Sequence, residues 1–189
     1  MTEQERSYWD ILEPHWSELG NYNDASDWLR IMEAFPQPII LLYAAHFSQS
    51  EICNGGFLQF FQNSSGVFAP EAVEGYRAIG MPLLAGVVRE AMSTLGPEYP
   101  RDRRLRWDAL QIASKRTPEE LETIRKNAKH PATAERQASQ PPSFDELEAQ
   151  FFQLIRSEGG GFDSAADAYA LATEPTLVWP IPSPNPTPR

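Results

Sequence analysis

The residues best suited to covalent chemistry are Cys53 and His46, which lie seven positions apart in the sequence. A thiolate is favoured at a helix start, and in one unbroken helix these residues would share a face and form a Cys–His pair. However, Asn54, Gly55 and Gly56 follow directly and are expected to interrupt that helix. His46 also lies in an apolar run, which favours a core histidine and a small buried cysteine. We therefore do not predict an enzyme, and a Cys/His or small-molecule enzyme is the least favoured alternative.

The sequence lacks the residue patterns that metal and cofactor sites require. His15 and His130 are isolated, so no two histidines have the spacing of metal ligands, and we predict no metal site. No strand is predicted before the glycine run 159–161, which argues against a dinucleotide-binding turn. Carboxylates are plentiful, but in a sequence a paired acid/base site looks the same as a solvated acidic face. No cofactor is predicted.

The composition indicates an acidic, folded protein. The chain has 189 residues, 41% of them hydrophobic, and a formal net charge of -10. Because DNA, RNA and anionic membranes repel a net anion, we expect no direct binding to nucleic acid or to a membrane. The single cysteine excludes an internal disulfide and fits a reducing compartment, and Met1 to Arg6 does not resemble a signal peptide. We therefore expect a cytoplasmic protein.

The charges are distributed unevenly along the chain. Residues 1–78 contain 11 acids and 3 bases, a net charge of -8. Residues 79–132 contain 7 acids and 10 bases, a net charge of +3, and residues 133–189 contain 8 acids and 3 bases, a net charge of -5. Two acidic arms thus flank a mildly basic middle, in which Arg101, Arg103, Arg104 and Arg106 cluster.

Helical signals predominate, so the predicted fold class is all-α. Asp24 is a predicted N-cap, the apolar run 39–47 predicts a central buried helix, and Ser143 to Glu146 forms a capping box. No segment alternates as a strand would. We expect one domain over residues 1–175 with an internal linker at 130–142. The proline-rich tail at 176–189 is expected to be extended.

The most distinctive segment is residues 51–66, with the sequence EICNGGFLQFFQNSSG. Two glycines in the first turn of a helix each cost about 1 kcal/mol relative to alanine, so a bare backbone must be required there. We interpret Asn54 as the N-cap and the glycines as positions where a neighbour approaches closely. The alternative, an anion bound by the exposed N–H groups, is less favoured because no Lys or Arg lies nearby in the sequence.

In this segment the chain resembles the bacterial DNA-mimic protein family. The resemblance covers roughly residues 37–95, and Glu71-Ala72 and Ile79-Gly80 extend it beyond the sharpest part. It implies an all-α fold and an acidic, dimeric surface that imitates the phosphates of duplex DNA and occupies a DNA-binding regulator. The matching residues, which we expect to be mainly structural, are Glu51, Asn54, Gly55, Gly56, Phe57, Gln59, Asn63 and Gly66.

The predicted partner is therefore a basic DNA-binding protein, contacted by acids of both arms. Duplex DNA carries roughly 20 charges per helical turn, and two chains of charge -10 together carry -20. The candidate contact acids are Asp10, Glu13, Glu18, Asp24, Asp27 and Glu33 in the first arm and Asp145, Glu146 and Glu148 in the second.

The same arithmetic and the resemblance predict a homodimer. The basic stretch from Arg101 to Arg106 is expected to meet an acidic arm of the second subunit at the rim of the interface, with Trp107 and Leu110 at its apolar centre. The alternative function is an interaction or scaffold domain that does not imitate DNA.

Overall fold

The computed structural model describes residues 7–113, 122, 126 and 143–173. Within these residues every regular element is a helix, which confirms the all-α prediction. The predicted linker at 130–142 and the predicted tail at 176–189 lie outside the described residues.

The first elements are short and cross one end of the domain. Pro14 lies at the start of a 3-10 turn that separates the first two helices, and Asp24 caps the third by accepting hydrogen bonds from Ser26 N and Asp27 N, as predicted. These elements are α1 (Trp9–Leu12), η1 (Glu13–His15), α2 (Trp16–Leu19) and α3 (Ala25–Ala34).

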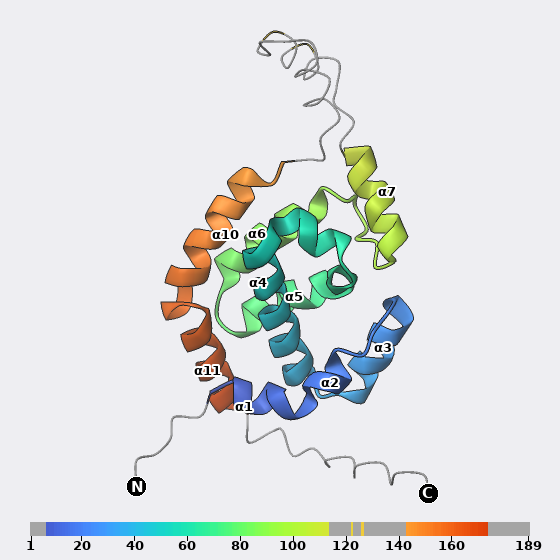
Figure 1. The fold of residues 1–189 in the computed structure, drawn as a ribbon. Helices are drawn as coiled ribbons and strands as arrows, with labels where there is room; N and C mark the ends of the chain where they lie inside the picture. Colours follow the sequence, from blue (N-terminus) through green and yellow to red (C-terminus); the bar gives the residue numbers. More distant parts are fainter. Residues whose placement is uncertain (1–6, 114–121, 123–125, 127–142, 174–189) are drawn as a thin grey trace, which may run out of the picture.

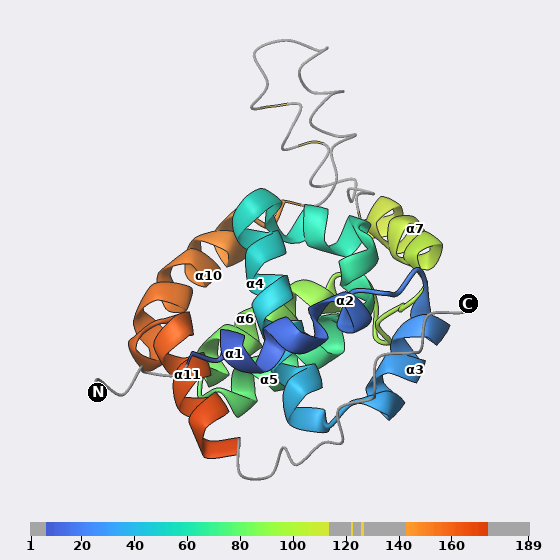
Figure 2. The same cartoon turned by 60° about the horizontal axis from the view of Figure 1, so that its bottom comes forward.

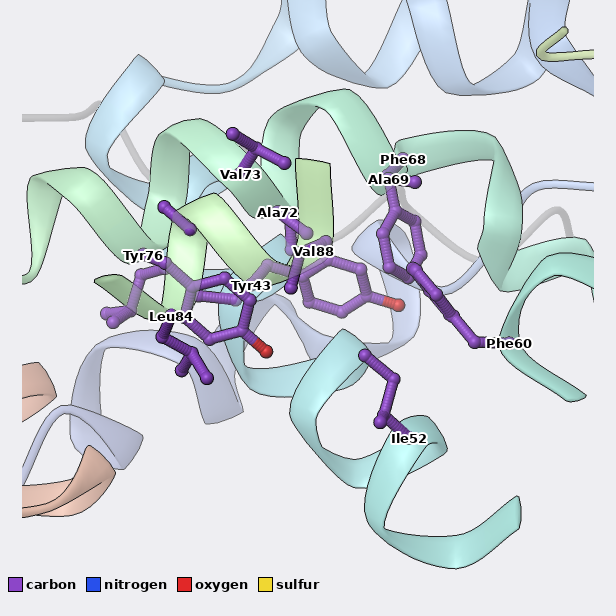
Figure 3. Close-up of a cluster of buried hydrophobic side chains, with 14 of the residues drawn as sticks. Tyr43, Ile52, Phe60, Phe68, Ala69, Ala72, Val73, Tyr76, Leu84 and Val88 are labelled. Atoms are coloured by element: carbon purple, nitrogen blue, oxygen red, sulfur yellow. The ribbon is translucent and has the colours of Figure 1, made fainter. Parts of the chain in front are cut away.

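The centre of the domain is α4 (Gln37–Gln62), and Figure 1 shows the other helices arranged around it. Its run from Ile39 to Ala45 is almost entirely buried, which confirms the predicted central helix. Figure 3 shows Tyr43, Ile52 and Phe60 of this helix in the core cluster with residues from its neighbours. Burying aromatic and aliphatic side chains of this size is the main source of the stability of such a fold.

Two helices that pack in succession complete the centre: α5 (Ala69–Ala78), which follows the 3-10 turn η2 (Ser64–Phe68) and contacts α4, and α6 (Pro82–Ser93), which contacts α5. Gly75 lets α5 lie against α4, because a Cβ atom there would overlap the backbone carbonyl of Leu41. Tyr76 is fully buried, and its hydroxyl lies 2.9 Å from Ser48 Oγ on α4.

The remaining helices pack around this centre. They are α7 (Arg103–Ala113), α10 (Asp145–Ser157) and α11 (Phe162–Thr173), with the 3-10 turn η3 (Glu158–Gly160) before α11. The predicted capping box at the start of α10 is wrong, because the N-cap is Phe144 and the Ser143 hydroxyl accepts the N–H of Asp145 instead of that of Glu146. Asp167 of α11 accepts hydrogen bonds from Ser7 Oγ and Tyr8 N, so α11 holds the start of α1. Figure 2 shows α1 and α11 side by side.

Candidate functional site

The family-like motif coincides with a break in α4. Gly55 and Gly56 have non-helical backbone angles, and Gly56 has a φ of 74° and a ψ of -179°, a combination that only glycine adopts readily. Asn54 keeps helical angles and is exposed, so its predicted role as an N-cap is wrong. The backbone N–H of Phe57, the first residue after the two glycines, instead donates to Glu148 Oε1 of α10 at 2.9 Å. The cap of the second half of α4 thus comes from a distant helix.

The glycines leave room for two side chains. A Cβ atom at Gly56 would overlap the Glu148 carboxylate, and one at Gly55 would overlap the side-chain amide of Gln59. Gln59 is needed elsewhere, because its Nε2 atom donates to Glu51 Oε2 at 3.3 Å. Asn63 Nδ2 donates to the same oxygen at 2.9 Å. Glu51 therefore joins the two halves of α4 across the break.

The end of α4 is capped by a buried arginine. Arg106 is 1% exposed, and its Nε and Nη2 atoms donate to the carbonyls of Phe61 and Asn63 at 2.8 and 2.7 Å. A Cβ atom at Gly66 would lie only 2.7 Å from Arg106 Nε. A cation at the C-terminus of a helix stabilises it through the exposed carbonyls. The conformations and contacts of Glu51, Gly55, Gly56, Gln59, Asn63 and Gly66 support a structural interpretation of the motif.

A second arginine is also bound within the fold. Arg101 makes a two-point ion pair with Glu71, with N–O distances of 2.6 and 2.8 Å. Glu71 is 7% exposed and also accepts a hydrogen bond from Trp28 Nε1 at 3.1 Å. The hydrogen bonds to Glu71 raise the pKa of the Arg101 guanidinium. Arg101 and Arg106 therefore stabilise this fold from within, instead of both being available at the rim of a dimer.

The predicted apolar centre of the dimer interface requires a correction. Leu110 is 1% exposed and belongs to the core, so it cannot lie at the centre of an interface. Trp107 is 42% exposed, but on a helix it lies on a different side from Leu105 and Ile112, which are 49% and 63% exposed. Leu105 and Ile112 are seven residues apart and share one face of α7.

The acids of the first arm are gathered on α1, η1, α2 and α3. We call the side chains of Asp10, Glu13, Glu18, Asp24, Asp27 and Glu33 the N-terminal acidic surface. All except Asp27 are exposed, and Arg30, the only Lys or Arg among residues 7–36, forms an ion pair with Asp27. Hydrogen bonds from the Asp27 backbone and the Ser26 side chain lower the pKa of Asp24, which keeps it ionised.

The second group of acids lies elsewhere. Asp145, Glu146 and Glu148 are in the first turn of α10, and the two views show that end of α10 on the other side of the domain from α3. Asp145 and Glu146 are exposed, whereas Glu148 is half-buried and binds Phe57. The six acids of the first arm therefore lie on elements that are consecutive in the chain, and the second group lies apart from them.

Cys53 and His46 do not form a pair. His46 Nδ1 lies 3.0 Å from the Tyr8 hydroxyl and its ring packs against Trp9, Trp16 and Phe162. Cys53 is exposed, so the expectation of a buried cysteine is wrong. Gln49 Nε2 lies 3.8 Å from the Cys53 Sγ atom. Desolvation by the surrounding residues raises the pKa of the thiol, even though the residue is exposed at the surface, and this opposes activation as a nucleophile.

The surface of the described residues contains hollows, two of which are relevant here. One, of about 570 Å³, is lined by Cys53, Arg156 and residues 160–164. The other, of about 450 Å³, lies between α3, η2 and α7 and is lined by four arginines and Trp107. In the part of the chain that the structure describes, no cluster of three or more His, Cys, Asp or Glu side chains has a geometry that would hold a metal ion. None of the described helices is long and apolar enough to cross a membrane.

The model of one protein family, described as DMP19-like protein, matches residues 33–173, which are 141 of the 189 residues. The chain belongs to the DMP19-like family. The match extends well beyond residues 37–95, over which the sequence suggested a resemblance, and includes the described helices from α4 to α11. Most of the N-terminal acidic surface precedes it. No curated protein and no solved structure is significantly similar to the chain.

Proposed function

We propose that the chain acts as a DNA mimic: it binds a basic DNA-binding protein, such as a transcriptional regulator, and competes with DNA for it. The observation that carries the proposal is the N-terminal acidic surface. Residues 7–36 contain six acids and one base, a net charge of -5 within about 30 residues. An uncompensated array of this kind attracts the basic groove or helix with which such a partner binds phosphates.

The first arm is favoured over the start of α10 because more of its charge is available. Five of its six acids are exposed. At the start of α10 only Asp145 and Glu146 are exposed, since Glu148 is engaged with Phe57. Asp145 and Glu146 lie within the family match, however, so a secondary contact there is a separate part of the proposal.

The internal roles of Arg101 and Arg106 support mimicry. Exposed arginines would weaken the negative potential, but Arg106 is buried and the charge of Arg101 is compensated by Glu71. This leaves Arg103 and Arg104 as the exposed cations of the basic stretch. The protein can therefore contain a cluster of four arginines without presenting four positive charges to a basic partner.

We also propose that two chains associate, which doubles the charge to -20. With Leu110 buried, the apolar centre of the interface is assigned to Leu105 and Ile112, which share an exposed face of α7. Static light scattering at micromolar concentration should give a mass near 42.6 kDa, twice the chain mass of 21.3 kDa. A mass near 21.3 kDa would contradict the dimer.

The proposal assigns no enzymatic step to the chain and places the complex in the cytoplasm of a bacterial cell. The direct test is affinity capture of partners from native cell extract with the full chain, followed by elution with duplex DNA. The expected result is a basic DNA-binding protein that duplex DNA displaces. Recovery of neutral or acidic partners alone would overturn the proposal.

A further inference from the structure

The hollow between α3, η2 and α7 is unusual for an acidic protein because arginines line much of it. Arg101, Arg103, Arg104 and Arg106 come from α7 and the residues before it, and Trp107 contributes its indole. The lining also includes Asn23 and Asp24, which directly precede α3, and Ser64 and Val67 from η2. Figures 1 and 2 both show α3 and α7 on the same side of the domain.

The acids around this hollow do not cancel its positive charge. Asp24 and Asp102 line it, and Glu71 pairs with Arg101, so three carboxylates face four guanidinium groups and leave a net charge of +1. Asp24 is occupied as the cap of α3, and Asp102 Oδ1 accepts the backbone N–H of Leu105. Arg106 is bound by backbone carbonyls. Because carbonyls carry no net charge, they do not neutralise the positive charge of Arg106, which lines the hollow.

Two arginines of the hollow have hydrogen-bond donors that bind no acceptor among the described residues. Arg103 uses Nε to bind the carbonyl of Gln62 at 2.7 Å, and its two terminal nitrogens have no partner among the described residues. Arg104 is exposed and has no hydrogen-bond or ion-pair partner in that part of the chain. Trp107 Nε1 donates to the same Gln62 carbonyl at 3.2 Å, which fixes the indole while leaving the side chain partly exposed.

We propose that this hollow binds a small anionic molecule that contains both a phosphate group and a flat aromatic ring, as a nucleoside monophosphate does. Arg103 and Arg104 supply forked guanidinium donors for the phosphate, and the Trp107 indole supplies an apolar surface on which the ring stacks. A volume of about 450 Å³ is within the range of small-molecule sites, and a bare phosphate ion would leave most of it empty. This site shares Asp24 with the N-terminal acidic surface, but its binding of a small anion does not rest on the proposed contact with a DNA-binding protein.

The test is isothermal titration calorimetry of the full chain at low salt with three ligands: adenosine monophosphate, inorganic phosphate and adenosine. The proposal predicts one site per chain, with adenosine monophosphate binding more tightly than either fragment. The variant Arg104→Ala should weaken binding of adenosine monophosphate about tenfold, the loss of one charge-assisted hydrogen bond. The control Arg89→Ala removes an exposed arginine on α6 and should leave the affinity unchanged.

A further variant separates the ring from the phosphate. Trp107→Leu should weaken binding of adenosine monophosphate but leave binding of inorganic phosphate unchanged. Absence of any binding of adenosine monophosphate at millimolar concentration would overturn the proposal, as would equal affinities of the Arg104→Ala and Arg89→Ala variants. If Trp107→Leu weakened the binding of adenosine monophosphate and of inorganic phosphate equally, stacking of the ring on the indole would be contradicted.

Discussion

Glu148 and Phe57 are 91 positions apart in the sequence, yet the Glu148 carboxylate binds the Phe57 N–H at 2.9 Å and caps the second half of α4. This contact explains the glycine pair, because the carboxylate occupies the space where a side chain at Gly56 would stand. The most distinctive sequence motif of the chain is thus the place where α10 is attached to the central helix.

Gly56→Ala should destabilise the fold by about 2 kcal/mol, because alanine is strained at a φ of 74° and would displace the Glu148 carboxylate. The free energy of unfolding in urea measures this. The control is Gly86→Ala on α6, where a Cβ atom meets nothing within 4 Å. Alanine there should be neutral or slightly stabilising. Equal stability of Gly56→Ala and the wild type would contradict the account of the break.

Glu148→Ala should cost about 2 kcal/mol, since it removes the charged acceptor of the Phe57 N–H. Glu146→Ala is the matched control, because Glu146 is exposed in the same turn of α10. Its effect should stay within about 0.5 kcal/mol. If the two variants unfold at the same urea concentration, Glu148 does not act as a cap.

Arg106→Ala should destabilise the chain by about 3 kcal/mol, because it removes the charged donor to the carbonyls of Phe61 and Asn63 at the end of α4. Gly66→Ala should also destabilise the chain, since the new Cβ atom would press on Arg106 Nε and on the carbonyl of Phe60. Arg104→Ala serves as the control and should be nearly neutral. A loss after Arg106→Ala no larger than that after Arg104→Ala would contradict the capping role.

His46 should make the stability depend on pH. Burial lowers the pKa of His46 in the folded chain below its ordinary value of 6.5, with the opposing charge of Asp163 as the smaller effect. The unfolded chain therefore binds a proton more readily as pH falls through 6.5. Stability is fully present above that pH and is progressively lost below it.

The measurement is the free energy of unfolding at pH 7.5 and at pH 5.5. The wild type should be less stable at the lower pH, and His46→Phe should show a smaller decrease. His15→Phe, the control at the other described histidine, should keep the wild-type decrease. An unchanged decrease in His46→Phe would contradict the assignment of this pH dependence to His46.

The sequence predicted the local features of this fold well and the long-range ones poorly. The cap at Asp24 and the buried run of α4 follow from residues close in the chain, and both are confirmed. The cap from Glu148 and the burial of Arg106 depend on helices that meet only after folding. Exposed Asp145 and half-buried Glu148 belong to the same turn, and no local signal distinguishes their roles.

The positions of the two acidic arms relative to each other in the fold likewise could not be predicted from the sequence. Charge counts identified two acidic arms, but only the packing of the helices shows that the start of α10 lies apart from α1 to α3. Leu110 and Trp107 are three positions apart on one helix, and the former turned out to be buried while the latter is partly exposed. Which face of α7 meets the core depends on contacts with α4 and η2 that the sequence pattern does not specify.

The central claim is that the N-terminal acidic surface takes the place of DNA, and competition between the chain and duplex DNA for the captured partner tests it most directly. Fluorescence anisotropy of labelled DNA bound to that partner should fall as the wild-type chain is added, and the affinity should weaken steeply with salt. The triple variant Asp10→Lys, Glu13→Lys, Glu18→Lys should displace DNA far less well, whereas Asp145→Lys with Glu146→Lys should retain most of the competition. Displacement by the triple variant at the wild-type concentration would contradict the claim.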